Sequence, residues 1–573
     1  MRAVCLLATL VVARVVTLYG RDLPLSIWSP FAYVWQDLLV ALIFFILDGA
    51  SKRPRIAWIA YGVLVGYVAL NVPVARVLST PLTWTMLRAA RGPLADSILH
   101  YATAPNLTAL AVPLVVGAIL PVALARRQIK LRPAYVGAAV AVIVTGMLAT
   151  SRVDTHGMHR NALGALVETS VPRVAAVAGS EDWRSSPFDH RATDDLSRLR
   201  GTMKGRNVVV IILESTGAGR LGLYGGAPDP APNLTSLAKH AVVFERAYAV
   251  YPESVKGLFA VLCSRYPAFD TAPETYARVP CASFAQTLGA AGYRTGLFHS
   301  GRFMYLGMRS VIERRGFEVL EDAGDIGGHV DSSFGIDDES TVRRMLHWID
   351  SADGPFLATY LPTAGHNPYV TSRTGPFKST TDFWRYMNAL HEGDAALGTL
   401  VDGLRARHLD ERTLFIVLGD HGEAFGEHPG NFAHTLFIHE ENVRVPYLIA
   451  APGAIRDHTR VSRVASVVDT APTLLDLLGL PAEAAHQGAS LLGPEPRMAL
   501  FYTDYSLGWL GLADACWKYL YEIDSRRSRL FDVCVDPGET RDRASDHPDR
   551  VDAYRHRVLA WSAAQKDLIS RQQ

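Results

Sequence analysis

The strongest constraint on this chain of 573 residues is the concentration of its apolar residues before residue 152. Five segments there approach or reach the ~20 residues with which a helix crosses a hydrocarbon core of ~30 Å. They predict a transmembrane domain of five helices over residues 1–152. The five segments are Ala3–Val16, Phe31–Leu47, Ile56–Leu78, Leu107–Leu124 and Tyr135–Ala149.

Basic residues in the connections predict the orientation of these spans, because Lys and Arg are retained on the cytoplasmic side. The second and fourth connections contain more of them than the first and third, which places the N-terminus in the cytoplasm and everything after the fifth span outside it. The second and fourth connections contain Lys52, Arg53, Arg55, Arg126, Arg127, Lys130 and Arg132, and the first and third contain Arg21, Arg76, Arg88 and Arg91.

Two ionisable residues, Arg14 and Asp37, lie within the expected spans. Charged side chains inside a bilayer usually pair or serve a function, so one interpretation is an intramembrane ion pair or a lipid-headgroup contact. The alternative is that both lie near span ends and extend their charged groups into water.

The whole chain carries a net charge of only +1 and no long basic block, which argues against a nucleic-acid partner.

Four of the five cysteines follow the expected spans and form two pairs with equal spacing, Cys263 with Cys281 and Cys516 with Cys534. Four cysteines allow three connectivities, and two local disulfides are the simplest of them. Disulfides are expected outside the cytoplasm, in agreement with the orientation from the basic residues. The alternative is four buried free thiols.

Strand-like and helix-like segments alternate after a connector over residues 153–205, in which Asn161–Val177 has the pattern of an interfacial helix. The alternation predicts a doubly wound α/β domain over residues 206–495, whose site forms at the carboxyl ends of its strands. Asn207–Leu213, a continuous β-branched run, is typical of a parallel strand buried on both faces. The other expected strands are Val242–Phe244, Thr295–Phe298, Phe356–Tyr360, Leu414–Leu418 and Pro446–Ile449, and the expected helices include Asn233–His240, Ser283–Ala291 and Phe383–Leu404.

Side chains suited to metal binding follow two of these strands. Glu214 comes after the first strand, and Asp420 and His421 come shortly after Leu414–Leu418. Two carboxylates and an imidazole suit a divalent ion such as Zn²⁺ or Mn²⁺. Ser254 begins an apolar helical segment, where it is either a nucleophile activated by a metal or the N-cap of the helix.

The order of these motifs resembles the alkaline-phosphatase-like superfamily, in its sulfatase and lipoteichoic-acid-synthase-like branch. The similar stretches lie between about residues 205 and 545 and include Asn207–Ser215, Gly419–Glu423, Glu440–Pro446 and Val468–Leu475. The resemblance implies a mainly parallel central sheet, with a small antiparallel subdomain over residues 496–573.

The resemblance also implies roles for individual residues. Glu214, Ser254, Asp420 and His421 would bind one divalent metal, Zn or Mn rather than Ca or Mg, with Ser254 as the nucleophile. Two further histidines, His366 and His434, would contact the transferred group, with His428 and His439 as nearby alternatives to His434. Such groups would face the negative charge that spreads over the equatorial oxygens of the transition state.

The stretch Ser254-Val-Lys-Gly-Leu258 departs from the sulfatase pattern Cys/Ser-x-Pro-x-Arg, because it lacks both the proline and the arginine. Conversion of the first residue to formylglycine is therefore not expected, and an unmodified hydroxyl suits phosphoryl chemistry better. Lys256 either supplies the positive charge of the missing arginine or is solvated.

Together these features predict a phosphotransferase of the cytoplasmic (inner) membrane whose catalytic domain lies on the periplasmic or extracellular side. It would move phosphoglycerol or phosphoethanolamine from a membrane lipid donor to an envelope glycan or lipid through a covalent intermediate on Ser254. The first alternative is a sulfuric ester hydrolase or phosphodiesterase on the same fold. The second is an inactive envelope scaffold, against which the presence of all four proposed metal-site residues argues.

Overall fold

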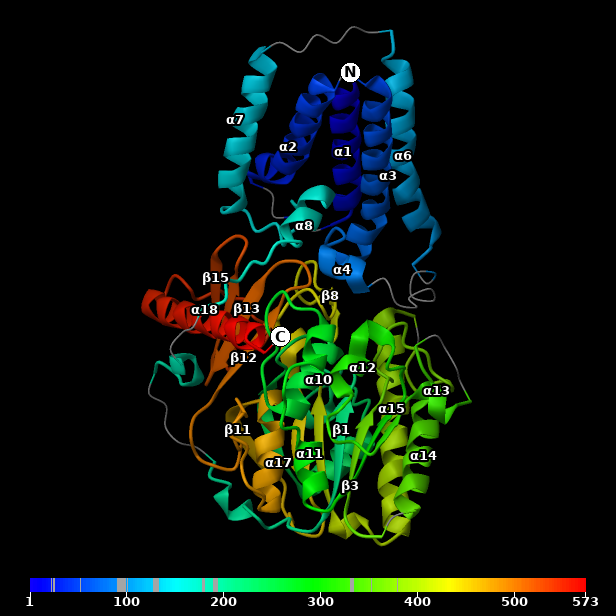
Figure 1. Cartoon of the computed structure of the whole chain (residues 1–573), viewed down its shortest axis with the longest axis vertical. Coiled ribbons are helices and arrows are strands. Elements are labelled where there is room, and N and C mark those ends of the chain that lie inside the picture. The colour runs from blue at the N-terminus through cyan, green and yellow to red at the C-terminus, as the bar shows by residue number, and fades with distance from the viewer. Residues whose placement is uncertain are drawn as a thin grey trace. The chain divides into compact units, whose positions relative to one another are not determined.

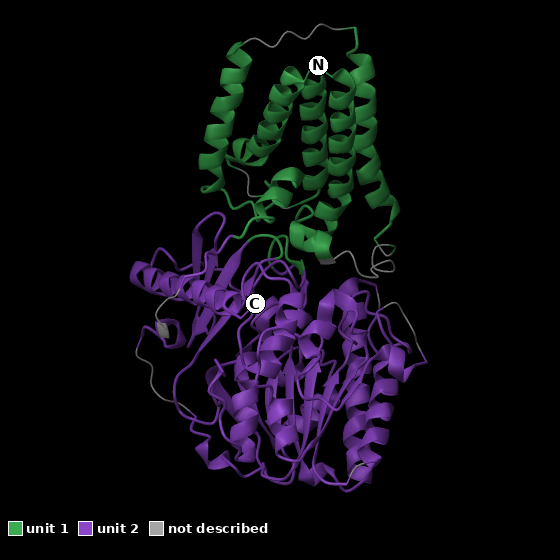
Figure 2. Cartoon of the chain, in the orientation of Figure 1, with its two compact units in different colours: residues 1–172, 428–432, 505–507 green, residues 173–427, 433–504, 508–573 purple. Residues whose placement is uncertain are grey.

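The computed structural model describes residues 1–573 except 22, 24–25, 52, 90–98, 100, 127–132, 178–180, 189–193, 330–333, 352, 379 and 573. The basic residues Lys52, Arg91, Arg127, Lys130 and Arg132 lie outside the described residues. The chain divides into two compact units (Figure 2). Unit 1 comprises Met1–Pro172, His428–Phe432 and Tyr505–Leu507, and unit 2 comprises Arg173–Glu427, Ala433–Asp504 and Gly508–Gln573.

Unit 1 is a bundle of apolar helices that coincide with the five apolar segments (Figure 1). Among the described residues, four helices are long and apolar enough to cross a membrane: α2 (Ser29–Ala50), α3 (Pro54–Leu78), α6 (Ala104–Ala123) and α7 (Pro133–Thr150). The first, α1 (Arg2–Leu18), has 17 residues, about 25 Å of helix. It forms as predicted but is shorter than the other four.

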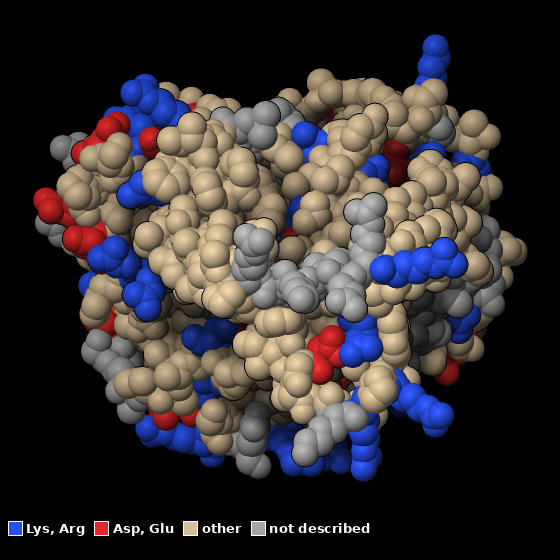
Figure 3. All heavy atoms as spheres, turned by 90° about the horizontal axis from the view of Figure 1, so that it is seen from above, with Lys and Arg blue, Asp and Glu red and all other residues tan. Residues whose placement is uncertain are grey.

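Large apolar side chains cover the outside of these helices. Ile46, Val122 and Leu148 are 59%, 76% and 62% exposed, an arrangement that suits a lipid environment rather than water. Viewed from above, most of the surface is uncharged, and the Lys, Arg, Asp and Glu residues gather mainly toward its edges (Figure 3). These helices therefore have the composition of a membrane anchor.

Two short helices also lie in the described residues of unit 1, α4 (Trp84–Ala89) and α8 (Ala162–Glu168). The interfacial helix expected over Asn161–Val177 is thus confined to its first half. Pro172 lacks a backbone N–H and disfavours helical conformation in the residue before it, so the helix does not extend through this point.

Arg14 and Asp37 form an ion pair inside unit 1, between α1 and α2. Nε of Arg14 lies 2.9 Å from Oδ2 of Asp37, and the two side chains are only 9% and 2% exposed. Asn161 donates a further hydrogen bond of 2.6 Å to the same carboxylate. The pairing interpretation is confirmed, and the alternative that both charged groups reach water is wrong.

Unit 2 contains a nine-stranded sheet of order β11-β2-β10-β6-β1-β5-β3-β4, with β9 beside β2. At its centre, β1 (Asn207–Leu213) runs parallel to β5 (Phe356–Leu361) and to β6 (Thr413–Gly419). Only β9 and β10 pair antiparallel with their neighbours. The mainly parallel sheet predicted from the sequence is confirmed. The other strands of this sheet are β2 (Ala241–Tyr248), β3 (Arg294–His299), β4 (Val319–Glu321), β9 (Arg444–Val445), β10 (Tyr447–Ala450) and β11 (Thr459–Ser466); β7 (Ala424–Phe425) and β8 (Phe432–Ala433) pair separately.

Helices cover the central sheet, which explains why β1 is apolar throughout. Val209 and Ile211 of β1 pack in one cluster with Leu400 of α15 (Asp382–Ala406). In Figure 1, α10 (Ser254–Cys263), α11 (Phe284–Ala290) and α17 (Thr470–Leu478) lie in front of the sheet. A strand covered on both faces needs apolar residues at every position. Other α-helices in the same part of unit 2 are α9 (Pro232–Leu237), α12 (Met308–Ile312), α13 (Ala323–Ile326), α14 (Asp338–Asp350) and α16 (Glu440–Val443).

The C-terminal region forms the predicted antiparallel subdomain, a four-stranded sheet of order β12-β13-β14-β15. The final helix, α18 (Pro548–Ser570), contributes the buried side chains of Tyr554 and Trp561. The strands are β12 (Met498–Thr503), β13 (Trp509–Asp514), β14 (Trp517–Glu522) and β15 (Arg527–Asp532).

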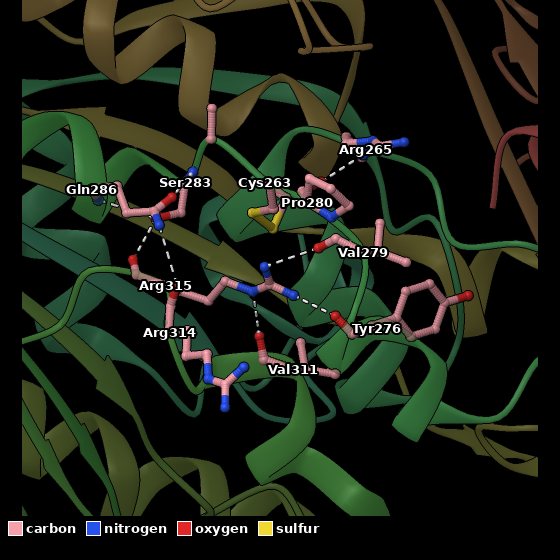
Figure 4. Close-up of a disulfide and its surroundings, with 12 residues drawn as sticks. Cys263, Arg265, Tyr276, Val279, Pro280, Ser283, Gln286, Val311, Arg314 and Arg315 are labelled. Carbon is pink, nitrogen blue, oxygen red and sulfur yellow. Dashed lines mark hydrogen bonds between the residues drawn. A yellow bond between two sulfur atoms is a disulfide. The ribbon is translucent and has the colours of Figure 1, made fainter. Parts of the chain in front are cut away.

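Both predicted disulfides are present, Cys263–Cys281 and Cys516–Cys534, so the free-thiol alternative is wrong. The first ties the C-terminal end of α10 to the segment before α11 (Figure 4). Arg315 secures the same segment by donating hydrogen bonds to three backbone carbonyls, those of Tyr276, Val279 and Val311. The helix that begins at Ser254 is therefore anchored at its far end.

Candidate functional site

The ends of β1 and β6 bring three metal-binding side chains together. Because Leu213 and Gly419 pair in register, the residues that follow them emerge side by side at one edge of the sheet. Nε2 of His421 lies 3.6 Å from Oε1 of Glu214 and 3.5 Å from Oδ2 of Asp420. All three side chains are buried, and one ligand atom from each lies within 4.8 Å of the others.

Ser254 contacts this cluster from the first turn of α10. Its hydroxyl donates a hydrogen bond of 2.8 Å to Oε2 of Glu214 and lies 3.3 Å from Nε2 of His421. The N-cap of α10 is Glu253, whose carboxylate accepts a hydrogen bond of 2.9 Å from the backbone N–H of Val255. The N-cap interpretation of Ser254 is therefore wrong, and its hydroxyl faces the carboxylate and the imidazole instead.

The backbone after β1 orients the two carboxylates. Ser215 has φ of 50°, a left-handed conformation that turns the chain sharply behind Glu214. The backbone N–H groups of Ser215 and His421 donate to Oδ1 of Asp420 at 3.0 and 2.7 Å, and the Ser215 hydroxyl donates to Oε1 of Glu214 at 2.8 Å. Oδ2 of Asp420 and Oε1 of Glu214 face His421, and Oε2 of Glu214 accepts from Ser254.

Burial and neighbouring charges shift the pKa values of all three metal-binding side chains. Burial alone would raise the pKa of Glu214, but the nearby imidazoles and the Ser215 hydroxyl lower this pKa to about 2. Burial and the charge of Glu214 raise the pKa of Asp420 well above its ordinary value. Burial lowers the pKa of His421 to about 3, so its ring is neutral.

A divalent metal fits this donor set. Nδ1 of His421 lies 3.1 Å from the carbonyl oxygen of Gly422, so the ring proton belongs on Nδ1 and the lone pair of Nε2 faces the carboxylates. Two adjacent buried carboxylates repel each other, and a cation between them would remove that repulsion. Carboxylate oxygens and a neutral imidazole are ligands that divalent transition metals accept.

His434 and His366 lie beside the cluster. The ring of His434 stacks on that of His421 with centroids 4.3 Å apart, and its Nδ1 lies 2.6 Å from Oε2 of Glu423. Burial would lower the pKa of His434, but Glu423 raises it to about 9. The His366 ring is 6.3 Å from that of His434 and stacks on Phe334, and burial lowers its pKa. One charged and one neutral imidazole thus face the same region.

Lys256 is buried, although it stands two positions after Ser254. It is 3% exposed, and its ammonium lies 3.0 and 2.9 Å from the two oxygens of Asp504. The alternative that Lys256 is solvated is therefore wrong. Its charge is compensated by Asp504, and the structure does not bring it to the group of Glu214, Ser254, Asp420 and His421.

Three residues around the site were given no role by the sequence. Glu423 holds His434, Ser215 holds Glu214, and Asp504 pairs with Lys256. Glu423 and Ser215 belong to motifs that carry the family resemblance, so the sequence indicated that they lie near the site, although not what they contact. Asp504 lies 248 positions from its partner, and nothing in the local sequence indicated the pair.

The comparisons with known proteins cover this region. Residues 206–480 match the model of the sulfatase family. Over 244 residues the chain is 30% identical to arylsulfatase K of Canis lupus familiaris, covering 37% of this chain and 44% of that protein. Over 300 residues it is 24% identical to the lipoteichoic acid synthase-like protein YvgJ of Bacillus subtilis (strain 168), covering 49% of this chain and 48% of that protein. The chain thus spans less than half the length of these curated relatives.

Solved structures agree with the fold. A protein in the alkaline phosphatase superfamily from Vibrio parahaemolyticus superimposes with a TM-score of 0.50 at 23% identity, covering 64% of this chain and 88% of that one. At this identity the likeness concerns the fold alone. Residues 206–480 therefore form a domain that matches the sulfatase family, and the curated relatives of this chain include both arylsulfatase K and a lipoteichoic acid synthase-like protein.

Proposed function

We propose that this chain is a membrane-anchored, metal-dependent phosphotransferase that acts through a covalent intermediate on Ser254. The observation that carries the proposal is the position of the Ser254 hydroxyl, 2.8 Å from Glu214 and 3.3 Å from His421 at the start of α10. The carboxylate of Glu253 caps this helix, so the Ser254 hydroxyl is free to face the metal-binding side chains. A hydroxyl in this position is well placed to attack a phosphate.

The proposed reaction has two steps, with a phosphodiester between Ser254 and glycerol or ethanolamine as the intermediate. In the first, Oγ of Ser254 forms a bond to the donor phosphorus while the bond from phosphorus to the lipid alcohol breaks. The serine loses a proton, and the alcohol, diacylglycerol or a similar molecule, leaves after gaining one. In the second, an acceptor hydroxyl bonds to the same phosphorus and loses its proton, and Ser254 leaves and regains one.

The side chains of the site divide this work. Glu214, Asp420 and His421 would hold the divalent metal, Zn or Mn, which supplies charge neutralisation and lowers the pKa of the serine hydroxyl. His366 and His434 would hydrogen bond to the equatorial oxygens, where negative charge spreads in the transition state. Glu423 keeps the His434 ring oriented toward the site.

The membrane helices support a lipid donor and a location at a membrane. The proposed donor is a glycerophospholipid and the acceptor an envelope glycan or lipid, with phosphoglycerol or phosphoethanolamine as the transferred group. The lipoteichoic acid synthase-like relative supports this class of reaction. The two disulfides and the basic residues of the connections support a site outside the cytoplasm, at the inner membrane of a bacterium.

The arylsulfatase K relative supports a second candidate, a hydrolase of sulfuric esters or phosphodiesters with water as the acceptor. Sulfatases need an aldehyde at the nucleophile, and Ser254-Val-Lys-Gly-Leu258 lacks the proline and arginine of the pattern that is converted. The phosphotransferase is therefore preferred. A third candidate, an inactive scaffold, has no need to retain a metal.

The deciding experiment incubates the full chain in detergent micelles with phosphatidylglycerol or phosphatidylethanolamine and examines peptides by mass spectrometry. We expect phosphoglycerol or phosphoethanolamine on Ser254 in the wild-type protein and in the exposed control Ser351→Ala, but none in Ser254→Ala. Label that persists in Ser254→Ala would overturn the assignment. Sulfate release that depends on an aldehyde at residue 254 would favour the hydrolase.

A further inference from the structure

Unit 1 contains a pocket of its own, among α1, α3 and the segment around Arg160. Its cavity volume is about 40 Å³, and the open space around its mouth brings the empty volume to about 440 Å³. One wall is apolar and includes Leu10, Val68 and Val72, which are 2–5% exposed. The other end is polar and contains the Arg14–Asp37 pair and Asn161. A pocket with one apolar and one charged end fits an amphiphilic ligand.

Arg160 lines this pocket and has an unused donor. Its side chain is 3% exposed; Nε lies 3.1 Å from Oε2 of Glu168, and Nη1 donates to the Ser506 hydroxyl at 3.0 Å. Nη2 is buried and has no hydrogen-bond partner in the described part of the chain. A buried charged donor without an acceptor is costly, and an anionic oxygen is its strongest acceptor.

The surroundings of the polar end carry excess positive charge. Arg21 donates to the Ser79 hydroxyl at 2.9 Å and to the Ala75 carbonyl at 3.0 Å, and both of these residues line the pocket. Arg76 donates to the carbonyl of Val16 at 2.6 Å. These partners are neutral, so the charges of Arg21 and Arg76 add to the field around the pocket.

Two carboxylates among the described residues near the pocket, Asp37 and Glu168, each compensate one arginine. Asp37 holds Arg14 through two hydrogen bonds, of 2.9 and 3.0 Å, and Glu168 holds Arg160 through one. Glu168 is 44% exposed, so water weakens its attraction for Arg160. The Nη2 donor of Arg160 is therefore left for an anionic acceptor.

We propose that this pocket binds an anionic glycerophospholipid, with Nη2 of Arg160 donating to an oxygen of the lipid phosphate. The apolar wall formed by α1 and α3 would contact the glycerol and the start of the acyl chains. A free phosphate would use the arginine but not the apolar wall, which is why the lipid is the preferred source of the anion. The inference concerns binding alone and does not depend on the transfer reaction.

The test measures lipid binding to the full chain in detergent micelles by native mass spectrometry. The probes are phosphatidylglycerol, diacylglycerol and inorganic phosphate. We expect phosphatidylglycerol to bind at least tenfold more tightly than either of the others, and Arg160→Gln to weaken its binding by about tenfold, the loss of one charge-assisted hydrogen bond. The exposed arginine variant Arg126→Gln should bind like the wild type.

A second variant guards against misfolding of Arg160→Gln. Ala75→Leu fills the pocket without removing a charge and should also weaken binding of phosphatidylglycerol by about tenfold or more. Equal binding of phosphatidylglycerol by the wild type and both variants would overturn the proposal. Equal affinity for diacylglycerol would exclude recognition of the phosphate, and equal affinity for inorganic phosphate would exclude recognition of the lipid.

Discussion

The hydroxyl of Ser254 donates a hydrogen bond of 2.8 Å to Glu214, a residue 40 positions earlier in the chain. The contact exists because α10 begins beside the carboxyl ends of β1 and β6. Each partner also contacts His421, at 3.3 and 3.6 Å. The nucleophile and the metal-binding side chains that we propose therefore form one group and should respond together to substitution.

Glu214→Gln should weaken divalent metal binding. It removes one of two adjacent carboxylates, and the effect should be at least about tenfold, since even outer-shell partners of metal ligands contribute that much. Metal content after dialysis against a graded chelator series checks this. The matched control is the exposed Glu411→Gln, which should retain metal like the wild type. Equal retention by all three proteins would show that Glu214 is not a ligand.

The sequence predicted the centre of the site better than its edges. Glu214, Asp420 and His421 follow buried strands directly, and the register of a parallel sheet then places them together. The partner of Lys256 was not predicted, because Asp504 comes from the end of β12 and only tertiary packing brings it there. The N-cap role of Glu253 was not predicted, because serine is a more frequent N-cap residue than glutamate and Ser254 stands next to it.

The strands of the central sheet were likewise predicted at the centre and missed at an edge. The six segments predicted as strands all overlap strands of the central sheet, because each is a run of apolar or β-branched residues. The edge strand β11 (Thr459–Ser466) was missed, because part of it is exposed and alternates polar residues with apolar ones. Unit 1 followed its apolar segments closely, but α8 ended early, before Pro172.

Gly365→Ala should disturb the site without changing a functional group. A Cβ at residue 365 would lie 2.2 Å from the backbone carbonyl oxygen of Glu214, so either the segment that carries His366 or the end of β1 must move. A displacement of this kind should lower kcat by about 100-fold. Steady-state transfer kinetics check this.

The matched control is Gly219→Ala, where an added Cβ meets nothing within 4 Å. This variant should keep the wild-type rate. If Gly365→Ala also kept the wild-type rate, the close packing between residue 365 and the end of β1 would have no bearing on turnover.

Lys256→Met should loosen α10, because it leaves the carboxylate of Asp504 buried without its cation. Breaking a buried ion pair from one side destabilises by about 3–5 kcal/mol. Hydrogen–deuterium exchange of the full chain should show faster exchange in residues 254–263. The double variant Lys256→Met/Asp504→Leu should recover part of the protection, since it removes the unpaired charge as well.

The exposed pair of Arg405 and Asp402 provides the comparison. These side chains are 62% and 74% exposed, so Arg405→Ala should change stability by less than about 1 kcal/mol. Unchanged exchange of α10 in Lys256→Met would show that the ion pair with Asp504 does not hold this helix.

Asp338 should make the stability of unit 2 depend on pH. It is buried, and its carboxylate accepts hydrogen bonds from the backbone N–H groups of Thr363 and Ala364 at 2.9 and 3.1 Å. Burial raises its pKa from 3.8 to about 6, against the opposing effect of these hydrogen bonds. The folded chain therefore holds a proton between pH 3.8 and about 6 that the unfolded chain has lost. This contribution to the unfolding free energy is complete below pH 3.8 and disappears as the pH rises to about 6.

Within this window the contribution of Asp338 falls by up to about 1.4 kcal/mol per pH unit, and Asp338→Asn should remove that part of the slope. Urea unfolding of unit 2 in the full chain, followed by pulse proteolysis at several pH values, measures it. The exposed variant Asp402→Asn should keep the wild-type slope, because its carboxylate is 74% exposed. An identical slope in Asp338→Asn and the wild type would mean that Asp338 ionises in the folded chain as it does in the unfolded one, despite its burial beside the segment that carries His366.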